Sequence, residues 1–164
     1  MTSTPVVVAD TSPINYLILT GDVAVLPVLF GRIVLPTVVR DELTRPKAPL
    51  TVRDWLANPP AWLEVRPSGQ TGDTSMADLD DGERSAILLA IELHADLLLI
   101  DERRAAKTAR SRGFRVAGTL AILGMAARRE LLSLSDAIDR LKRTSFHYRQ
   151  EILDQFLADQ GGKA

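Results

Sequence analysis

The sequence predicts an α/β protein in which helices cover both faces of a mostly parallel central sheet. Residues 6–9 and 97–100 are short, wholly apolar runs, which is typical of strands buried on both faces. Longer segments with helical spacing separate the strand-like runs, and this alternation favours parallel strands joined by right-handed crossovers. We therefore expect a three-layer α/β/α sandwich.

Glycine and proline mark the ends of the elements expected in the first half of the chain. Gly21 and Gly31 end two short helices, and Pro46 and Pro59 follow two more. These helices are expected at residues 13–19, 22–30, 37–44 and 50–56, with strands at 33–35 and 62–65. Residues 67–75 are rich in Gly, Ser and Thr and are expected to form an exposed loop within one domain.

The same alternation continues in the second half. A helix from about residue 83 to 94 is apolar nearly all round, which indicates deep burial. The strand at 97–100 follows, and Gly113 ends the next helix. The remaining elements are a strand at 115–117 and helices at 102–112, 119–129, 135–142 and 146–158.

Composition limits the classes of function. With 164 residues, we expect one domain over 1–164, with a core of about 5–130 and a helical extension of about 131–160. The net charge of −1 excludes a wholesale basic coat for nucleic acid, although a local basic patch stays open. The absence of cysteine excludes disulfides, thiolate metal sites and cysteine nucleophiles. No run is long enough to span a bilayer, and we expect a cytoplasmic protein.

Four acidic residues stand at positions where strands end or helices begin. Asp10 and Asp101 each follow a buried strand, and ligands of open parallel sheets bind outside those strand ends. Glu83 begins the apolar helix, and Glu42 lies on an amphipathic helix. Taken singly, the acids are also explained as caps, helix-dipole partners or surface residues. Grouped carboxylates repel one another, and Mg²⁺ or Mn²⁺ would neutralise them and support phosphoryl chemistry.

The order of these motifs resembles the PIN-domain family. The matching residues are Asp10-Thr11-Ser12, Glu42, Gly82-Glu83, Asp101 and Gly118-Thr119, and the resemblance covers roughly residues 5–130. Members of that family are metal-dependent ribonucleases, many of them VapC-type toxins of toxin–antitoxin pairs. Glu83 stands where many members have Asp. Leu99 stands where many have Thr, a hydroxyl that Thr119 is placed to supply.

The resemblance implies an activity, a site and partners. It implies a three-layer α/β/α fold, an endoribonuclease that uses Mg²⁺ or Mn²⁺, an RNA substrate, a cognate antitoxin and a homodimer. Its catalytic and metal-binding residues would be Asp10, Glu42, Glu83 and Asp101, with Thr11, Ser12, Asp81 and Thr119 as secondary candidates.

A basic stretch begins directly after the fourth acid. Arg103, Arg104, Lys107 and Arg110 are candidates for binding RNA phosphates, and a solvated helix face is the alternative interpretation.

Two other functions stay open. One is a non-catalytic PIN-like module that binds RNA or protein. The other is a phosphotransfer enzyme with Asp10 as nucleophile, although such folds usually have a second Asp where this chain has Ser12.

Overall fold

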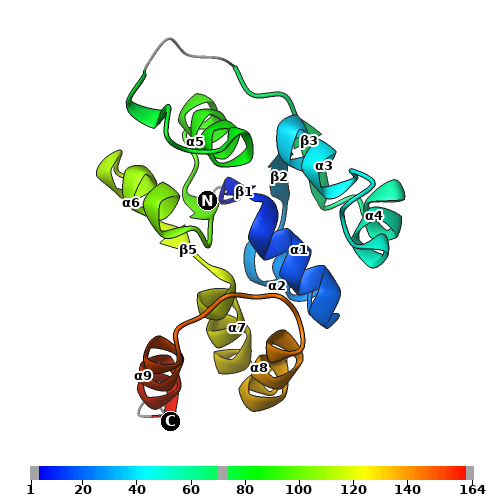
Figure 1. Ribbon diagram of the computed structural model, residues 1–164, viewed down its shortest axis with the longest axis vertical. Helices are drawn as coiled ribbons and strands as arrows, with labels where there is room; N and C mark the ends of the chain where they lie inside the picture. The colour runs from blue at the N-terminus through cyan, green and yellow to red at the C-terminus, as the bar shows by residue number, and fades with distance from the viewer. Residues whose placement is uncertain (1–3, 70–73, 162–164) are drawn as a thin grey trace.

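The computed structural model describes residues 4–69 and 74–161. Within this part of the chain, five parallel strands form one sheet in the order β3-β2-β1-β4-β5 (Figure 1). The strands are β1 (Val7–Ala9), β2 (Ile33–Pro36), β3 (Leu63–Arg66), β4 (Leu97–Leu99) and β5 (Val116–Ala117). All strands predicted from the sequence are present, and the described sheet is wholly rather than mostly parallel.

The helices cover both faces of this sheet, so the predicted three-layer α/β/α sandwich is confirmed (Figure 1). They are α1 (Thr11–Thr20), α2 (Val25–Phe30), α3 (Thr37–Leu43), α4 (Leu50–Ala57), α5 (Asp81–Leu93), α6 (Arg103–Ser111), α7 (Thr119–Arg128), α8 (Leu134–Lys142) and α9 (Gln150–Gly161). A short 3-10 helix, Thr74–Met76, precedes α5. The predicted loop at 67–75 falls partly on residues 70–73, which lie outside the described residues.

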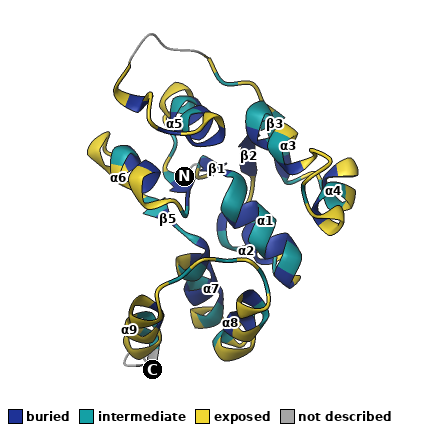
Figure 2. Cartoon of the chain, in the orientation of Figure 1, coloured by how far each residue is buried: buried dark blue, intermediate teal, exposed yellow. Residues whose placement is uncertain are grey.

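Strand alternation divides the core into two clusters. Val7 and Ala9 face one side of the sheet, where α1, α4, α7 and α8 pack, whereas Val8 faces α5 and α6 on the other side. On β4, Leu99 joins the first cluster and Leu98 the second. Buried side chains therefore line the inner surfaces of both helical layers (Figure 2).

The strand order places a topological switch point at the centre of the sheet. From β1 the chain moves outward through β2 and β3, and then returns to place β4 on the other side of β1. Ala9 pairs with Leu99 across this boundary, and the N–H of Asp10 donates to the carbonyl of Leu99 at 2.9 Å. Ligands of such sheets bind outside the carboxyl ends of strands that flank a switch point. The segments that follow β1 and β4 therefore begin side by side.

Several helix starts differ from the sequence prediction, and two of them bear on the site and the C-terminal segment. Helix α1 begins at Thr11 with Asp10 as its N-cap residue, so it includes two residues that were expected to precede it. Helix α9 begins at Gln150 rather than 146 because the preceding segment packs on the core in a non-helical conformation. In that segment Phe146 makes an edge-to-face contact with Tyr16, with ring centroids 5.1 Å apart. Among the described helices, none is long and apolar enough to cross a membrane.

Candidate active site

Asp10 follows β1 and is the centre of an acidic cluster, a name used here for Asp10, Glu42, Asp80 and Glu83. It is 5% exposed, its side chain makes no capping hydrogen bond to α1, and its Oδ1 is buried without a partner. The pKa of Asp10 is raised to about 7, chiefly by burial and also by the charges of Asp80, Glu83 and Glu42, while the backbone N–H of Thr11 partly offsets the rise. A capping role therefore does not explain this carboxyl group.

Glu42 reaches the cluster from α3. Its Oε2 accepts a hydrogen bond of 2.8 Å from the hydroxyl of Thr11. The carboxylate also lies against Gly82 in the first turn of α5, where an added Cβ would be 2.9 Å from both of its oxygens. Gly82 thus allows the Glu42 carboxylate to approach the α5 backbone, which a larger residue would prevent.

Glu83 is oriented by a capping box at the start of α5. Its Oε1 accepts from the N–H of Asp80 at 3.0 Å, and Oδ1 of Asp80 accepts from the N–H of Glu83 at 2.8 Å. Glu83 is only 7% exposed. Burial raises its pKa, and the charges of Asp80, Glu102 and Glu42 add to the rise. Glu83 therefore forms the hydrogen bonds expected of a residue in the first turn of a helix. Its side chain also belongs to the acidic cluster.

Asp101 is held at the start of α7. Its Oδ1 accepts from the N–H of Thr119 and its Oδ2 from the Thr119 hydroxyl, each at 2.6 Å. A Cβ added at Gly118 would be 2.7 Å from Oδ1, so the carboxylate lies tightly against the start of α7. Burial raises the pKa of Asp101, and the two hydrogen bonds from Thr119 partly offset this rise. The charges of two other predicted acids, Glu83 and Glu42, raise the pKa of Asp10, whereas Asp101 is bound to Thr119.

The next residue, Glu102, faces the cluster instead. Its Oε2 accepts from the N–H of Ala105 at 2.7 Å as the N-cap of α6, and its charge raises the pKa of Glu83. Neither Glu102 nor Asp80 was among the predicted site residues. Two signals were available in the sequence. Neighbouring residues of an extended segment point to opposite sides, and the spacing of Asp80 and Glu83 fits a capping box.

The four secondary candidates have different surroundings in the structure. Thr11 holds Glu42, and Thr119 holds Asp101. Ser12 is half-buried in the first turn of α1. Asp81 is exposed and pairs with Arg84, so it faces away from the acidic cluster.

The four predicted phosphate-binding residues also differ in their surroundings. Arg103 and Arg110 line a groove that Asp101 also lines. Arg104 pairs with Asp78 at 3.4 Å. Lys107 is exposed and is not among the residues that line this groove.

The acidic cluster has the chemistry of a site for a hard cation. Its donors are all carboxylate oxygens, and one of them, Oδ1 of Asp10, is buried without a partner. Within residues 4–69 and 74–161, no three acidic side chains are already placed to coordinate one ion.

Comparison with known families agrees with this architecture. A family model described as a PIN domain matches residues 6–161. The chain belongs to the PIN-domain family. The match continues beyond residue 130 and includes α8 and α9, which the motifs alone did not cover. No curated protein and no solved structure matches the chain. PIN domains have a nuclease-like fold, and the acidic cluster of this chain lies at its switch point.

Proposed function

We propose that this PIN domain is an endoribonuclease that depends on Mg²⁺ or Mn²⁺. The observation that carries the proposal is the buried, unpartnered Oδ1 of Asp10 among other acids. A buried polar atom without a partner is costly, and mutual repulsion among carboxylates adds to the cost. A divalent cation would relieve both, and Asp10, Glu42 and Glu83 are the residues that would hold it.

The chain's own residues orient the site. Thr11 fixes the Glu42 carboxylate, the capping box fixes Glu83, and Gly82 leaves space for Glu42 beside α5. When bound, the cation would activate a water molecule and stabilise the charge that develops on the phosphodiester. Glu102, the N-cap residue of α6, adds a further carboxylate, and its charge raises the pKa of Glu83. We assign Glu102 as the fourth acid of the site and Asp101 as the residue that positions it.

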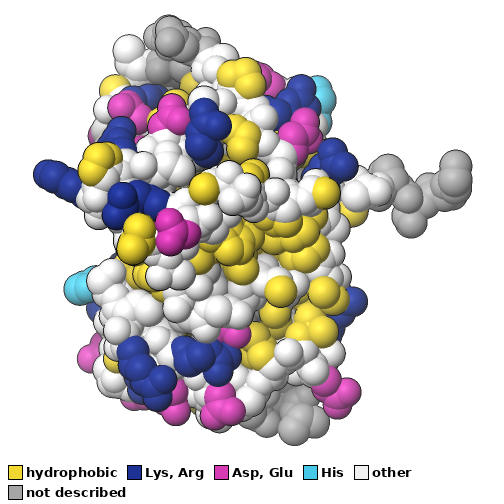
Figure 3. Space-filling model, turned by 90° about the vertical axis from the view of Figure 1, so that its right-hand side faces the viewer, with side chains coloured by type: hydrophobic (Ala, Val, Ile, Leu, Met, Phe, Trp, Pro, Cys, Tyr) yellow, Lys and Arg dark blue, Asp and Glu magenta, His cyan; other side chains and the backbone are white. Residues whose placement is uncertain are grey.

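The toxin role, the antitoxin and the homodimer are proposals that rest on the family resemblance. Arrest of growth on induced expression, relieved by the Asp10→Asn change, would support a toxin. For the homodimer, one face of the molecule carries a continuous band of apolar side chains between charged regions (Figure 3). Light scattering at tens of micromolar tests this proposal, and a clean monomer would contradict it.

The nuclease proposal is tested by a pair of acid-to-amide variants. Asp10→Asn should abolish both the Mn²⁺-dependent rise in Tm and the cleavage of a single-stranded RNA. Asp81→Asn is the matched control, because Asp81 is exposed and pairs with Arg84 outside the cluster. It should retain both properties. A wild-type protein whose Tm does not respond to Mn²⁺ would indicate a non-catalytic module instead.

A further inference from the structure

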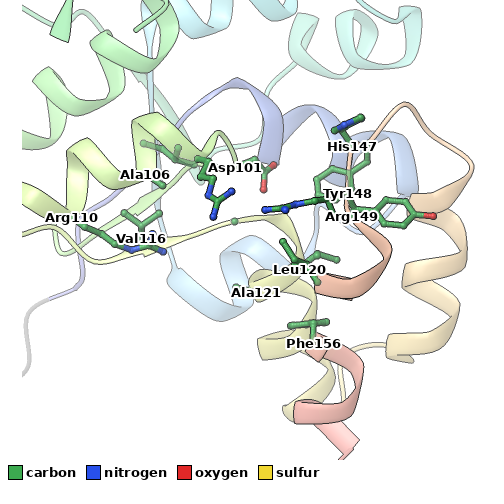
Figure 4. Close-up of a pocket in the computed structure, with 15 residues that line it drawn as sticks. Asp101, Ala106, Arg110, Val116, Leu120, Ala121, His147, Tyr148, Arg149 and Phe156 are labelled. Carbon is green, nitrogen blue, oxygen red and sulfur yellow. The ribbon is translucent and has the colours of Figure 1, made fainter. Parts of the chain in front are cut away.

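A second feature lies beside Asp101. It is a groove of about 530 Å³ between α6, the start of α7 and the segment that leads into α9 (Figure 4). Its floor is apolar and includes Val116, Leu120 and Phe156. This volume lies within the range of sites that take small molecules or single nucleotides, about 300–1,000 Å³.

Three arginines border the groove. Arg103 and Arg110 are seven residues apart and lie on one face of α6, and Arg149 comes from the segment before α9. Arg110 and Arg149 extend toward the groove from opposite sides (Figure 4). In the part of the chain that the structure describes, none of the three side chains has an ion-pair or hydrogen-bond partner, whereas Arg104 pairs with Asp78 and Arg140 with Asp22.

Among the described residues, the acid of the groove, Asp101, forms no ion pair with these arginines. Both oxygens of Asp101 accept hydrogen bonds from Thr119. The groove therefore combines an apolar floor with unpaired guanidinium groups. A ligand that complements it has a flat apolar part and at least one anionic group, since guanidinium groups bind phosphates well and stack on planar rings.

The groove is continuous with the candidate active site along the chain. Asp101 lines the groove, and the next residue, Glu102, faces the acidic cluster. The first groove arginine, Arg103, directly follows Glu102, so a polyanion bound at the cluster would extend toward the groove. This continuity favours a nucleic acid strand over an unrelated acidic ligand.

We propose that this groove binds the RNA strand next to the scissile phosphate, with one unpaired base on the apolar floor and the adjoining phosphates on Arg103, Arg110 and Arg149. The proposal rests on the ribonuclease function and specifies its substrate class. A base in a duplex is stacked and paired, so only a single-stranded or extruded nucleotide can enter such a groove.

Binding of RNA without cleavage tests the groove directly. The probe is a fluorescein-labelled, single-stranded RNA dodecamer of mixed sequence, titrated with the full chain in EDTA and followed by fluorescence anisotropy. Arg149→Glu reverses a charge in the groove, and Ala121→Glu places a carboxylate at an exposed α7 position that lines it. Lys47→Glu is the matched control, because it makes a charge reversal of the same size at an exposed turn position outside the groove.

Arg149→Glu and Ala121→Glu should each weaken binding by about tenfold or more, with a much smaller effect of Lys47→Glu. Arg149→Ala should also reduce the slope of log affinity against log salt by about 0.7, the value for one phosphate contact on a single strand. The duplex of the same sequence should bind more weakly than the single strand. Thermal melts of the variants close to that of the wild type would exclude misfolding as the cause.

Other outcomes overturn the proposal. The proposal would be contradicted if both groove variants bound RNA with wild-type affinity. It would also be contradicted if the duplex bound as tightly as the single strand. If the groove variants lose binding of an acidic, apolar helical peptide while RNA binding is unchanged, the groove is a protein-binding site. Cleavage is scored separately with Mn²⁺. RNA binding through the groove without cleavage contradicts the nuclease proposal alone, and cleavage that is unaffected by the groove variants contradicts the groove proposal alone.

Discussion

Thr119 donates two hydrogen bonds to Asp101, from its N–H to Oδ1 and from its hydroxyl to Oδ2, each 2.6 Å long. These bonds join the end of β4 to the start of α7, two elements that lie on either side of β5 in the chain. Asp101 thereby satisfies a backbone donor in the first turn of α7 that has no partner within the helix. The arrangement holds Asp101 at the start of α7, while the charge of the next residue, Glu102, raises the pKa of Glu83.

Substitutions at these two neighbouring positions should separate stability from metal binding. Asp101→Asn places an amide opposite the Thr119 donors, and the loss of charge-assisted hydrogen bonds should lower the free energy of unfolding by about 1.5–3 kcal/mol. Glu102→Gln retains an acceptor for the N–H of Ala105 and should change stability little, while reducing the Mn²⁺-dependent rise in Tm. Urea denaturation and Mn²⁺ titration measure the two effects. A loss of the Mn²⁺ response in Asp101→Asn alone would return Asp101 to the metal-binding set.

Gly82 offers a test of the site that leaves all the acids in place. In Gly82→Ala the new Cβ would be 2.9 Å from both oxygens of Glu42, so the Glu42 carboxylate must move away from α5. We expect the fold to be retained, because the end of a flexible side chain gives way, while the Mn²⁺ response and RNA cleavage fall together. Gly118→Ala is the comparison variant. Its new Cβ would be 2.7 Å from Oδ1 of Asp101, so this substitution should lower the free energy of unfolding rather than the Mn²⁺ response. Equal Mn²⁺ responses in Gly82→Ala and wild type would exclude Glu42 from the site.

The raised pKa of Asp10 predicts how stability depends on pH without metal. Its ordinary pKa of 3.8 applies to the unfolded chain, and the folded value is about 7. Because the folded state keeps the proton longer, Asp10 lowers stability as pH rises from about 4 to 7, by an amount on the order of 4 kcal/mol. In EDTA, the free energy of unfolding of wild type should therefore fall relative to Asp10→Asn over this range. The buried amide costs the same at every pH, so the difference in slope is the measurement. Parallel pH profiles would show that Asp10 ionises normally.

The sequence predicted the layers of the fold because its signals for them are local. Val8 and Leu98 lie in runs without polar residues, and glycines such as Gly21 mark helix ends. The site was less predictable, since the direction of a carboxylate depends on contacts distant in sequence. Asp101 and Glu102 are adjacent, and the hydrogen bond between Asp101 and Thr119, eighteen positions away, is not indicated by the local sequence pattern. Likewise, Arg149 joins the groove through the packing of a segment that the sequence pattern predicted as helix.

The C-terminal helix contributes to the core through one face and leaves the other exposed. On α9, Leu153 is 1% exposed, whereas its neighbour Ile152 is 50% exposed. Leu153→Ala should therefore lower the free energy of unfolding by about 2–5 kcal/mol, as large-to-small changes in cores do. Ile152→Ala should change it by about 0.5 kcal/mol or less if the chain is monomeric, because surface substitutions rarely cost more. Urea denaturation of both variants at low protein concentration makes the comparison. If Ile152→Ala is as destabilising as Leu153→Ala, and its effect grows with protein concentration, then the exposed face of α9 is buried between two copies of the chain.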